Sequence, residues 1–308
     1  MIIIEVLYKA KKRIKKIYND YFTINGQYTS LLPDKIYLKK LYKKRTGKEL
    51  NLKNPITYND KLNWIKLYDR NPQYTILADK YAVRKYVKEK IGVEYLIPLI
   101  GVWDSVEEID FDSLPKRFVL KCNHDNGVII CQDKSLFDIE KAKREITYHF
   151  NRNYYKKCRE WPYKNIKRKI ICEKYMEDRN QPTLMDYKFF CFNGEPRLIY
   201  VAQVISGELC INFFDMSFNS INISRRDHPC FPKDYEIEKP KELEKMISIA
   251  RKLSNGIPSI RVDLYNIDNK IYFGELTFFT AGGFIPFVPE KWDKILGDWI
   301  ELPKKRRR

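Results

Sequence analysis

The sequence predicts an α+β chain in which antiparallel hairpins alternate with a few helices. Short apolar runs are joined by tight polar turns, most clearly at Asn193-Gly194, which lies between two strand-like segments. The segment 240–255 carries apolar side chains at helical spacing, with Pro240 at its start and Gly256 just past its end. No internal repeat and no long linker interrupts this order.

Length and composition bound the class of protein. The chain has 308 residues, of which 44% are hydrophobic and 14% aromatic, enough for a sizeable core and two or three subdomains. The net charge of +18 indicates an anionic partner: a nucleic acid, a membrane surface, a phosphorylated ligand or an acidic polymer. The sign of the charge does not choose among these partners.

The cysteines and the N-terminus indicate a cytoplasmic protein. Seven cysteines, an odd number without a CxxC pair, are best read as buried reduced thiols. A zinc site is not expected, because the three histidines lie far apart in the sequence. The apolar run at the N-terminus precedes its charges, the reverse of a secretory signal, and no run is long enough to cross a bilayer.

Residues 1–55 are expected to form a basic helical arm, and residues 304–308 a disordered basic tail. In the arm, lysines alternate with apolar residues, and a second basic cluster follows at 39–45. A basic amphipathic helix can lie on an anionic membrane. The alternative, slightly favoured, is a solvated helix whose apolar stripe packs on the body of the protein.

Residues 56–115 are expected to hold helices followed by short strands and loops. A helix predicted from 75 to 91 contains the pair Asp79-Lys80. Asp110 and Asp112 form a D-x-D pattern, which occurs in metal-dependent glycosyltransferases. Because the pattern is so short, a solvated loop is favoured there.

Residues 116–178 contain a lysine at the mouth of a polar loop. A buried strand at 118–120 is followed by Lys121, by the loop 123–127 and by a second strand at 128–131. Such a lysine can hold a phosphate that the loop amides cradle, or it is a solvated lysine on a plain hairpin. The helical stretch 135–165 is aromatic and basic, and packing on a sheet is favoured over nucleic-acid binding.

Two carboxylates mark the hairpin predicted for residues 261–279. A hairpin can bring Asp263 and Glu275 together on one face, where they repel unless a cation or proton lies between them. Mg²⁺ takes such carboxylates together with substrate phosphates. Arg261 points to the same face of the strand as Asp263 and suits a phosphoryl group. A surface hairpin with scattered charges is the alternative.

Taken in order, these segments resemble the ATP-grasp superfamily, and in detail its TupA-like branch, which is associated with cell-surface polysaccharide biosynthesis. The resemblance covers about residues 57 to 300. It is carried by KLNWIKLYDRNP, ADKYAVRKYV, LIPLIGVWDS, FVLKCNH, DYKFFCFNGEP, RVDLYN and IYFGELTFF. It implies an ATP-grasp fold, in which two α+β lobes of largely antiparallel sheet clasp a nucleotide. The small lobe would span 116–178 and the large lobe, with the magnesium site, 179–303.

The resemblance also implies roles for individual residues. Lys80 and Lys121 match lysines that contact phosphate, and Lys188 is a further phosphate ligand. The hinge that reads the adenine edge matches Glu173, Lys174, Tyr175 and Met176, and Asp186 matches the acidic residue that holds the ribose. Arg261 matches the arginine that steadies the transferred phosphoryl group, so Arg261 and Lys121 are the expected catalytic residues. Asp263 and Glu275 match the magnesium ligands.

Two positions depart from the family pattern. The loop after Lys121 has a single glycine, Gly127, and places Asp125 where it would face like-charged phosphates. Thr277 stands where many ATP-grasp enzymes have an asparagine as a further metal ligand. A threonine hydroxyl can still bind the metal directly or through water, so Thr277 is kept in the predicted metal site.

The implied activity is ligation of a carboxylate to an amine with ATP and Mg²⁺ through an acyl phosphate. The implied setting is capsular or cell-surface polysaccharide biosynthesis in the cytoplasm, at the inner membrane face if the basic arm binds there. One substrate would be a glycan or glycolipid intermediate. Three alternatives stay open: a glycosyltransferase, a catalytically weakened protein that binds nucleotide or glycan, and a nucleic-acid binder, for which no recognised motif is present.

Overall fold

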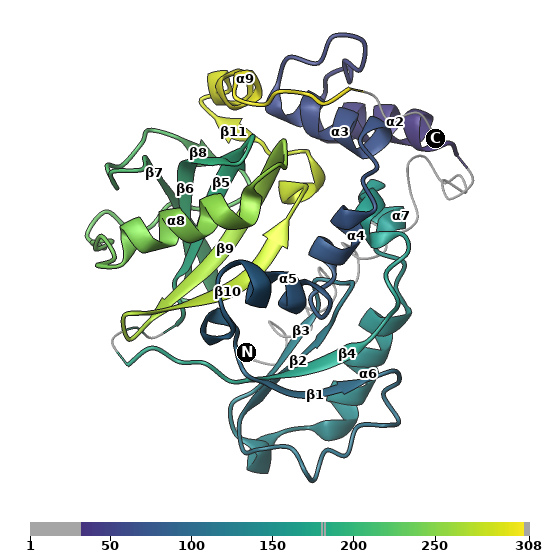
Figure 1. Cartoon of the computed structure of the whole chain (residues 1–308), viewed down its shortest axis with the longest axis vertical. Helices are drawn as coiled ribbons and strands as arrows, with labels where there is room; N and C mark the ends of the chain where they lie inside the picture. Colours follow the sequence, from purple (N-terminus) through teal and green to yellow (C-terminus); the bar gives the residue numbers. More distant parts are fainter. Residues whose placement is uncertain (1–31, 180, 182, 305–308) are drawn as a thin grey trace, which may run out of the picture.

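The computed structural model describes residues 32–179, 181 and 183–304, and these form two main antiparallel sheets with helices around them (Figure 1). The expected arm before residue 32, and residues 305–308 of the expected basic tail, lie outside the described residues. The prediction of an α+β chain built from antiparallel hairpins is confirmed.

The smaller sheet has the strand order β1-β4-β2-β3. Its strands are β1 (Leu99–Trp103), β4 (Ile170–Lys174), β2 (Phe118–Cys122) and β3 (Val128–Cys131). Helix α6 (Ile139–Asn151) covers one face and buries Ile146 against Phe118 and Leu120. Because side chains alternate along a strand, Lys121 and Glu173 point to the opposite face, away from this core.

The larger sheet has the order β10-β9-β5-β6-β7. Its strands are β10 (Lys270–Thr277), β9 (Ser259–Ile267), β5 (Asp186–Phe192), β6 (Glu195–Ile205) and β7 (Glu208–Phe214). Helix α8 (Leu243–Ser254) covers one face, where Cys191 lies against the carbonyl of Ala250. Asn193-Gly194 and Asp268-Asn269 have positive φ, the geometry of the tight turns between these strands.

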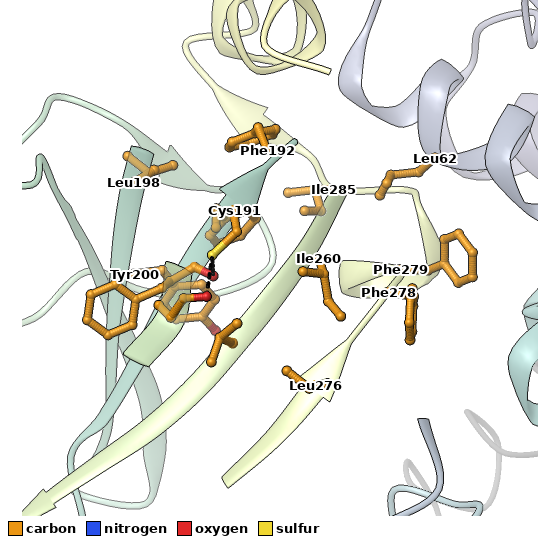
Figure 2. Close-up of a cluster of buried hydrophobic side chains, with 14 of the residues drawn as sticks. Leu62, Cys191, Phe192, Leu198, Tyr200, Ile260, Leu276, Phe278, Phe279 and Ile285 are labelled. Atoms are coloured by element: carbon orange, nitrogen blue, oxygen red, sulfur yellow. Dashed lines mark hydrogen bonds between the residues drawn. The ribbon is translucent and has the colours of Figure 1, made fainter. Parts of the chain in front are cut away.

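A helical layer joins the two sheets. It contains α2 (Asp34–Thr46), α3 (Tyr58–Tyr68), α4 (Gln73–Ala78), α5 (Val83–Lys90), η2 (Val93–Tyr95), α7 (Tyr155–Cys158), η4 (Trp161–Tyr163), η5 (Thr280–Gly282) and α9 (Lys291–Asp298). The short helix η3 (Lys134–Leu136) follows β3 and bonds to the segment before β2. A small sheet pairs β8 (Ser224–Arg225) with β11 (Phe287–Val288). Figure 2 shows how Leu62 of α3 and Ile285 bring this layer toward Phe192 and Ile260 of the larger sheet.

One helix prediction is wrong. The helix expected from 75 to 91 is divided into α4 and α5 at Asp79. The Asp79 carboxylate accepts hydrogen bonds from the backbone N–H groups of Tyr81 (2.8 Å) and Ala82 (3.1 Å), as a capping residue does. Lys80 therefore lies in the turn between two helices, and its side chain leaves the helical surface.

Three other expectations can be placed in the structure. Asp110 and Asp112 lie in an exposed turn, where an Asp110 carboxylate oxygen accepts the N–H of Asp112 (3.0 Å). The cysteines are free thiols, and all but Cys230 are buried. Within the part of the chain that the structure describes, no helix has the length and apolar content needed to cross a membrane.

Candidate active site

The predicted carboxylates lie in one row across three strands of the larger sheet. Asp263 of β9 is the cross-strand partner of Glu275 on β10 and of Lys188 on β5. Side chains in such a row point to the same face, opposite to the face that α8 covers. The sheet therefore gathers two acidic side chains and one basic side chain, although Lys188 lies 75 residues before Asp263 in the chain.

A bulge at Gly274 puts Glu275 into this row. The register shifts between Phe273, which pairs with Leu264, and Glu275, which pairs with Asp263, so Gly274 is an extra residue in β10. If Gly274 paired regularly with Asp263 and formed no bulge, Glu275 would lie opposite Val262 and its side chain would point to the core face. A side chain at Gly274 would come within 3.1 Å of the Asp263 carbonyl oxygen and 3.2 Å of the Tyr265 ring, so the bulge favours glycine.

Arg261 ties these groups together. Its guanidinium makes two parallel hydrogen bonds to Asp263, from Nε to Oδ1 (2.6 Å) and from Nη2 to Oδ2 (2.7 Å). The same Nη2 donates to Thr277 Oγ1 (3.0 Å) and to Glu275 Oε1 (3.3 Å). Burial alone would lower the pKa of Arg261, but the negative charges of Asp263 and Glu275 have the larger effect and raise this pKa. Arg261, Asp263, Glu275 and Thr277 thus form one connected group.

Lys188 continues this group toward Asp186. Its ammonium lies 2.7 Å from Asp263 Oδ2 and 3.0 Å from Asp186 Oδ2. Burial disfavours the charged form of Lys188, but these two carboxylates outweigh it and raise the pKa. The second Asp186 oxygen, Oδ1, is buried without a hydrogen-bond donor in the described structure. Burial raises the pKa of Asp186, and the free oxygen can accept a hydrogen bond from a ligand hydroxyl.

A pocket lies between this row and the smaller sheet. Its lining comes from both sheets, from α5 and from the turn before α5: Lys80, Arg84, Lys121, Ile171, Glu173, Phe273 and Gly274. Glu173 is ion-paired with Lys121 (2.7 Å) and with Arg84 (3.1 Å). Lys80 donates to the Asp125 carbonyl oxygen (3.0 Å) and lies 3.6 Å from Glu275 Oε2. Lys80 therefore joins the small-sheet loop to the carboxylate row.

Glu275 is the most accessible carboxylate of the row. Its side chain is 37% exposed, whereas that of Asp263 is 2% exposed and accepts hydrogen bonds on both oxygens. Burial opposes ionisation of Glu275, but the charges of Lys80, Arg261 and Lys188 outweigh burial and lower its pKa to about 2. Glu275 is thus an ionised carboxylate that a cation entering from solvent can reach.

The expectation that Asp125 faces bound phosphates is wrong. Its side chain is buried and turned toward α6, where Oδ1 lies 2.7 Å from His149 Nδ1 and Oδ2 lies 3.3 Å from Arg152. Oδ1 also accepts the N–H of Gly127 (2.7 Å). Burial alone would raise the pKa of Asp125, but His149 and Arg152 lower it. Asp125 therefore fixes the loop, and its carbonyl oxygen accepts the hydrogen bond from Lys80.

A buried polar face of α3 holds the loop that follows β10. Asn59 exchanges two hydrogen bonds with the backbone of Ile285 (2.8 and 2.9 Å). Asn63 donates to the Gly283 carbonyl (2.8 Å), and Lys66 donates to the Gly282 carbonyl (2.5 Å). The loop includes left-handed residues at 281–283, which this network stabilises. It thereby anchors the segment just after Glu275 and Thr277.

The structure brings most of the predicted site residues together. Lys80, Lys188, Asp186, Arg261, Asp263, Glu275 and Thr277 share one network, and Lys121 and Glu173 lie in the adjoining pocket. Lys174, Tyr175 and Met176 follow at the end of β4 but do not line that pocket. Arg84 was missed, although it lies four residues after Lys80, a spacing that places side chains on one face of a helix.

Comparison with protein families finds one match over most of the chain. The model of the TupA-like ATP-grasp family matches residues 60–301. None of the curated proteins matches the sequence.

Solved structures give distant matches. D-alanine–D-alanine ligase from Bacillus anthracis complexed with ATP has 19% identity and a TM-score of 0.39, over 66% of this chain and 55% of that chain. N5-carboxyaminoimidazole synthetase from Staphylococcus aureus complexed with ADP has 13% identity and a TM-score of 0.39, over 74% and 52%. D-alanine–D-alanine ligase from Helicobacter pylori has 12% identity and a TM-score of 0.39, over 73% and 62%. The matches thus span little more than half of each of these proteins.

Proposed function

Because this chain belongs to the TupA-like ATP-grasp family, we propose that it is an ATP- and Mg²⁺-dependent ligase that joins a carboxylate to an amine through an acyl phosphate. The observation that supports the proposal most is the network of Arg261, Asp263, Glu275 and Lys188 beside a lysine-lined pocket. Phosphoryl transfer needs such positioned charges and no nucleophilic side chain.

ATP would bind between the two sheets. Lys80 and Lys121 would hold its phosphates, and the segment Glu173, Lys174, Tyr175 and Met176 would receive the adenine. The N–H of Lys174 is already bonded to the Pro98 carbonyl (2.9 Å), so the adenine edge would be read by the residues that follow it. The free oxygen of Asp186 fits a ribose hydroxyl. As the nucleotide enters, the Lys121 ammonium would leave its ion pair with Glu173 and bind phosphate.

The residues fit a magnesium site of two carboxylates and a hydroxyl. Asp263, Glu275 and Thr277 offer hard oxygen ligands on one face, and Glu275 is accessible and ionised. The described residues hold no cluster of three or more His, Cys, Asp or Glu side chains, so substrate oxygens and water would complete the coordination. When bound, Mg²⁺ would neutralise phosphate charge. Arg261 would turn from Asp263 toward the phosphoryl group.

The protein's part in the reaction would be to position reactants and stabilise charge. A substrate carboxylate oxygen attacks the γ-phosphorus of ATP, ADP leaves, and the acyl phosphate forms. Arg261 and Lys188 lie where negative charge on the transferred phosphoryl group would be stabilised. The amine then attacks the carbonyl carbon, the bond from that carbon to the phosphate oxygen breaks, and phosphate leaves.

The wider role proposed is attachment of an amino acid or a similar amide in capsular or cell-surface polysaccharide biosynthesis. It would take place in the cytoplasm or at the inner membrane face, with a glycan or glycolipid intermediate as one substrate. A second candidate is a nucleotide-binding protein with weakened activity. It is favoured by the saturation of both Asp263 oxygens by Arg261 and Lys188. The exposed Asp110 and Asp112 give no support to a glycosyltransferase.

The test is release of ADP from Mg-ATP with a panel of amino acids and uronic acids. The ligase proposal expects release that depends on a carboxylate and is lost in Glu275→Gln. Asp268→Asn, an exposed change in the turn of the same hairpin, is the matched control and should behave as the wild type. Nucleotide binding without ADP release on any substrate would favour the weakened relative. Turnover of a nucleotide sugar in place of ATP would overturn both.

A further inference from the structure

Glu173 of β4 is shared by two cationic side chains inside the pocket between the sheets. Its Oε1 accepts a hydrogen bond from Arg84 Nη1 (3.1 Å), and its Oε2 lies 2.7 Å from the Lys121 ammonium. The side chain of Glu173 is 10% exposed, whereas that of Lys121 is 20% exposed. All three side chains line the pocket where ATP is proposed to bind. One buried carboxylate is therefore neutralised from two sides.

The two cations are held differently. Arg84 also donates from Nη2 to the Ile97 carbonyl oxygen (2.8 Å), so its planar guanidinium is fixed between the segment before β1 and Glu173. The Lys121 ammonium has Glu173 as its only polar partner among the residues that the structure describes. A lysine carries its charge on a flexible four-carbon stem, so Lys121 can turn to a new anion while Arg84 stays in place.

Glu173 needs a cation whether or not a nucleotide is present. A carboxylate taken out of water is costly unless a cation and hydrogen bonds compensate it. If Lys121 turns to a phosphate, its ion pair with Glu173 is broken. Within the described part of the chain, Arg84 is then the only side-chain cation in contact with Glu173. The free energy of moving Lys121 therefore depends on Arg84, although Arg84 itself need not touch ATP.

We propose that Arg84 is a positioning residue, which keeps Glu173 paired and so releases Lys121 to bind the phosphates of ATP. The inference rests on the proposed function, because it needs ATP in this pocket. Without Arg84, the Glu173 carboxylate would retain Lys121 as its one remaining cation. The binding of phosphate would then weaken, whereas the binding of adenosine, which has no phosphate, would not.

The test measures whether the effect of Arg84→Gln depends on Glu173. Isothermal titration calorimetry gives the Kd for ATP and for adenosine in the wild type, Arg84→Gln, Glu173→Gln and the double variant. We expect Arg84→Gln to raise the Kd for ATP about tenfold or more, and the Kd for adenosine less than about twofold. In the Glu173→Gln background, where Lys121 has no carboxylate to leave, the same substitution should change the Kd for ATP less than about twofold.

Two further variants distinguish this effect from a loss of structure. Arg84→Lys keeps a positive charge beside Glu173, so its Kd for ATP should stay closer to that of the wild type than the Kd of Arg84→Gln does. Arg251 of α8 and Glu195 of β6 form an exposed ion pair (2.8 Å), and neither lines the pocket. Arg251→Gln is thus the matched control, with a Kd for ATP equal to that of the wild type. Thermal unfolding of each variant is measured in parallel.

The outcomes separate this inference from the proposed function. A loss of ATP affinity that is equally large in the Glu173→Gln background would mean that Arg84 binds the nucleotide or supports the fold, and would overturn the inference. An unchanged Kd for ATP in Arg84→Gln, or an equal loss of affinity for ATP and adenosine, would also overturn it. A wild type that does not bind ATP would overturn the proposed function together with the inference.

Discussion

Asp263 and Glu275 are cross-strand partners because Gly274 forms a bulge, as an extra residue between Phe273 and Glu275. Buried positions in β10 change parity at this point, from Ile271 and Phe273 to Leu276. The bulge thus turns Glu275 to the face that carries Arg261 and Lys188.

Gly274→Ala should weaken the metal site more than it weakens the fold. The added methyl group meets the Asp263 carbonyl oxygen at 3.1 Å, so the bulge must widen and Glu275 must move. We expect the Mg²⁺ concentration for half-maximal ADP release to rise about tenfold, equivalent to about 1.4 kcal/mol. Thermal unfolding measured alongside separates this effect from loss of structure. An unchanged Mg²⁺ requirement would show that the bulge does not place Glu275.

Thr277→Val and Thr277→Ser form a matched pair. The Thr277 hydroxyl accepts from Arg261 Nη2 and donates to Glu275 Oε1 (2.9 Å), and valine has the same shape without the hydroxyl. We expect Thr277→Val to lower kcat at least tenfold, since a lost bond to a charged group is worth about 1.5–3 kcal/mol. Thr277→Ser should stay close to the wild type. Equal kcat values for the wild type and the two variants would show that Thr277 has no role in the site.

Lys121→Met should weaken nucleotide binding. Lys121 is 20% exposed and is paired with Glu173 in the pocket, where it can turn to phosphate. We expect the Kd for ATP to rise about tenfold to a hundredfold, as for the loss of one charge-assisted hydrogen bond. Isothermal titration calorimetry measures it, with the exposed Lys116→Met as control. An equal Kd for ATP in both variants would show that Lys121 does not bind the phosphates.

Asp125→Asn should destabilise the fold at neutral pH. Removing the charge leaves Arg152 and His149 without their buried partner, at an expected cost of about 3 kcal/mol. The pKa of Asp125 is lowered in the folded state, so its stabilisation is present above the unfolded pKa and is lost as the pH falls. The difference in free energy of unfolding between wild type and variant should therefore shrink toward pH 3. Urea denaturation at several pH values checks this, and a pH-independent difference would contradict it.

Glu160→Gln should stabilise the protein relative to the wild type as the pH rises. The pKa of Glu160 is raised to about 7 in the folded state, so the wild type loses stability between about pH 4.5 and 7 as this carboxyl ionises. The shift corresponds to about 3 kcal/mol at most. Denaturant unfolding at pH 5 and pH 8 measures the difference between wild type and variant. If that difference is the same at both pH values, the pKa of Glu160 is not raised in the folded protein.

Much of the fold follows from local patterns. Tight turns such as Asn193-Gly194 and the alternation in β5 and β9 predict the hairpins, and the apolar spacing of α8 predicts that helix. The spacing of Arg261 and Asp263 also places both side chains on one face of a strand. These features depend on residues close together in the chain, so a single sequence contains them.

Local sequence patterns predict the hairpins and the helix α8, and the family resemblance singles out the set of charged residues. Which of these charges come into contact is known only from the three-dimensional structure. It places Glu275 beside Asp263 through the Gly274 bulge and turns Asp125 inward to His149. These outcomes depend on packing between distant segments, and the burial and desolvation that fix them are absent from any local pattern.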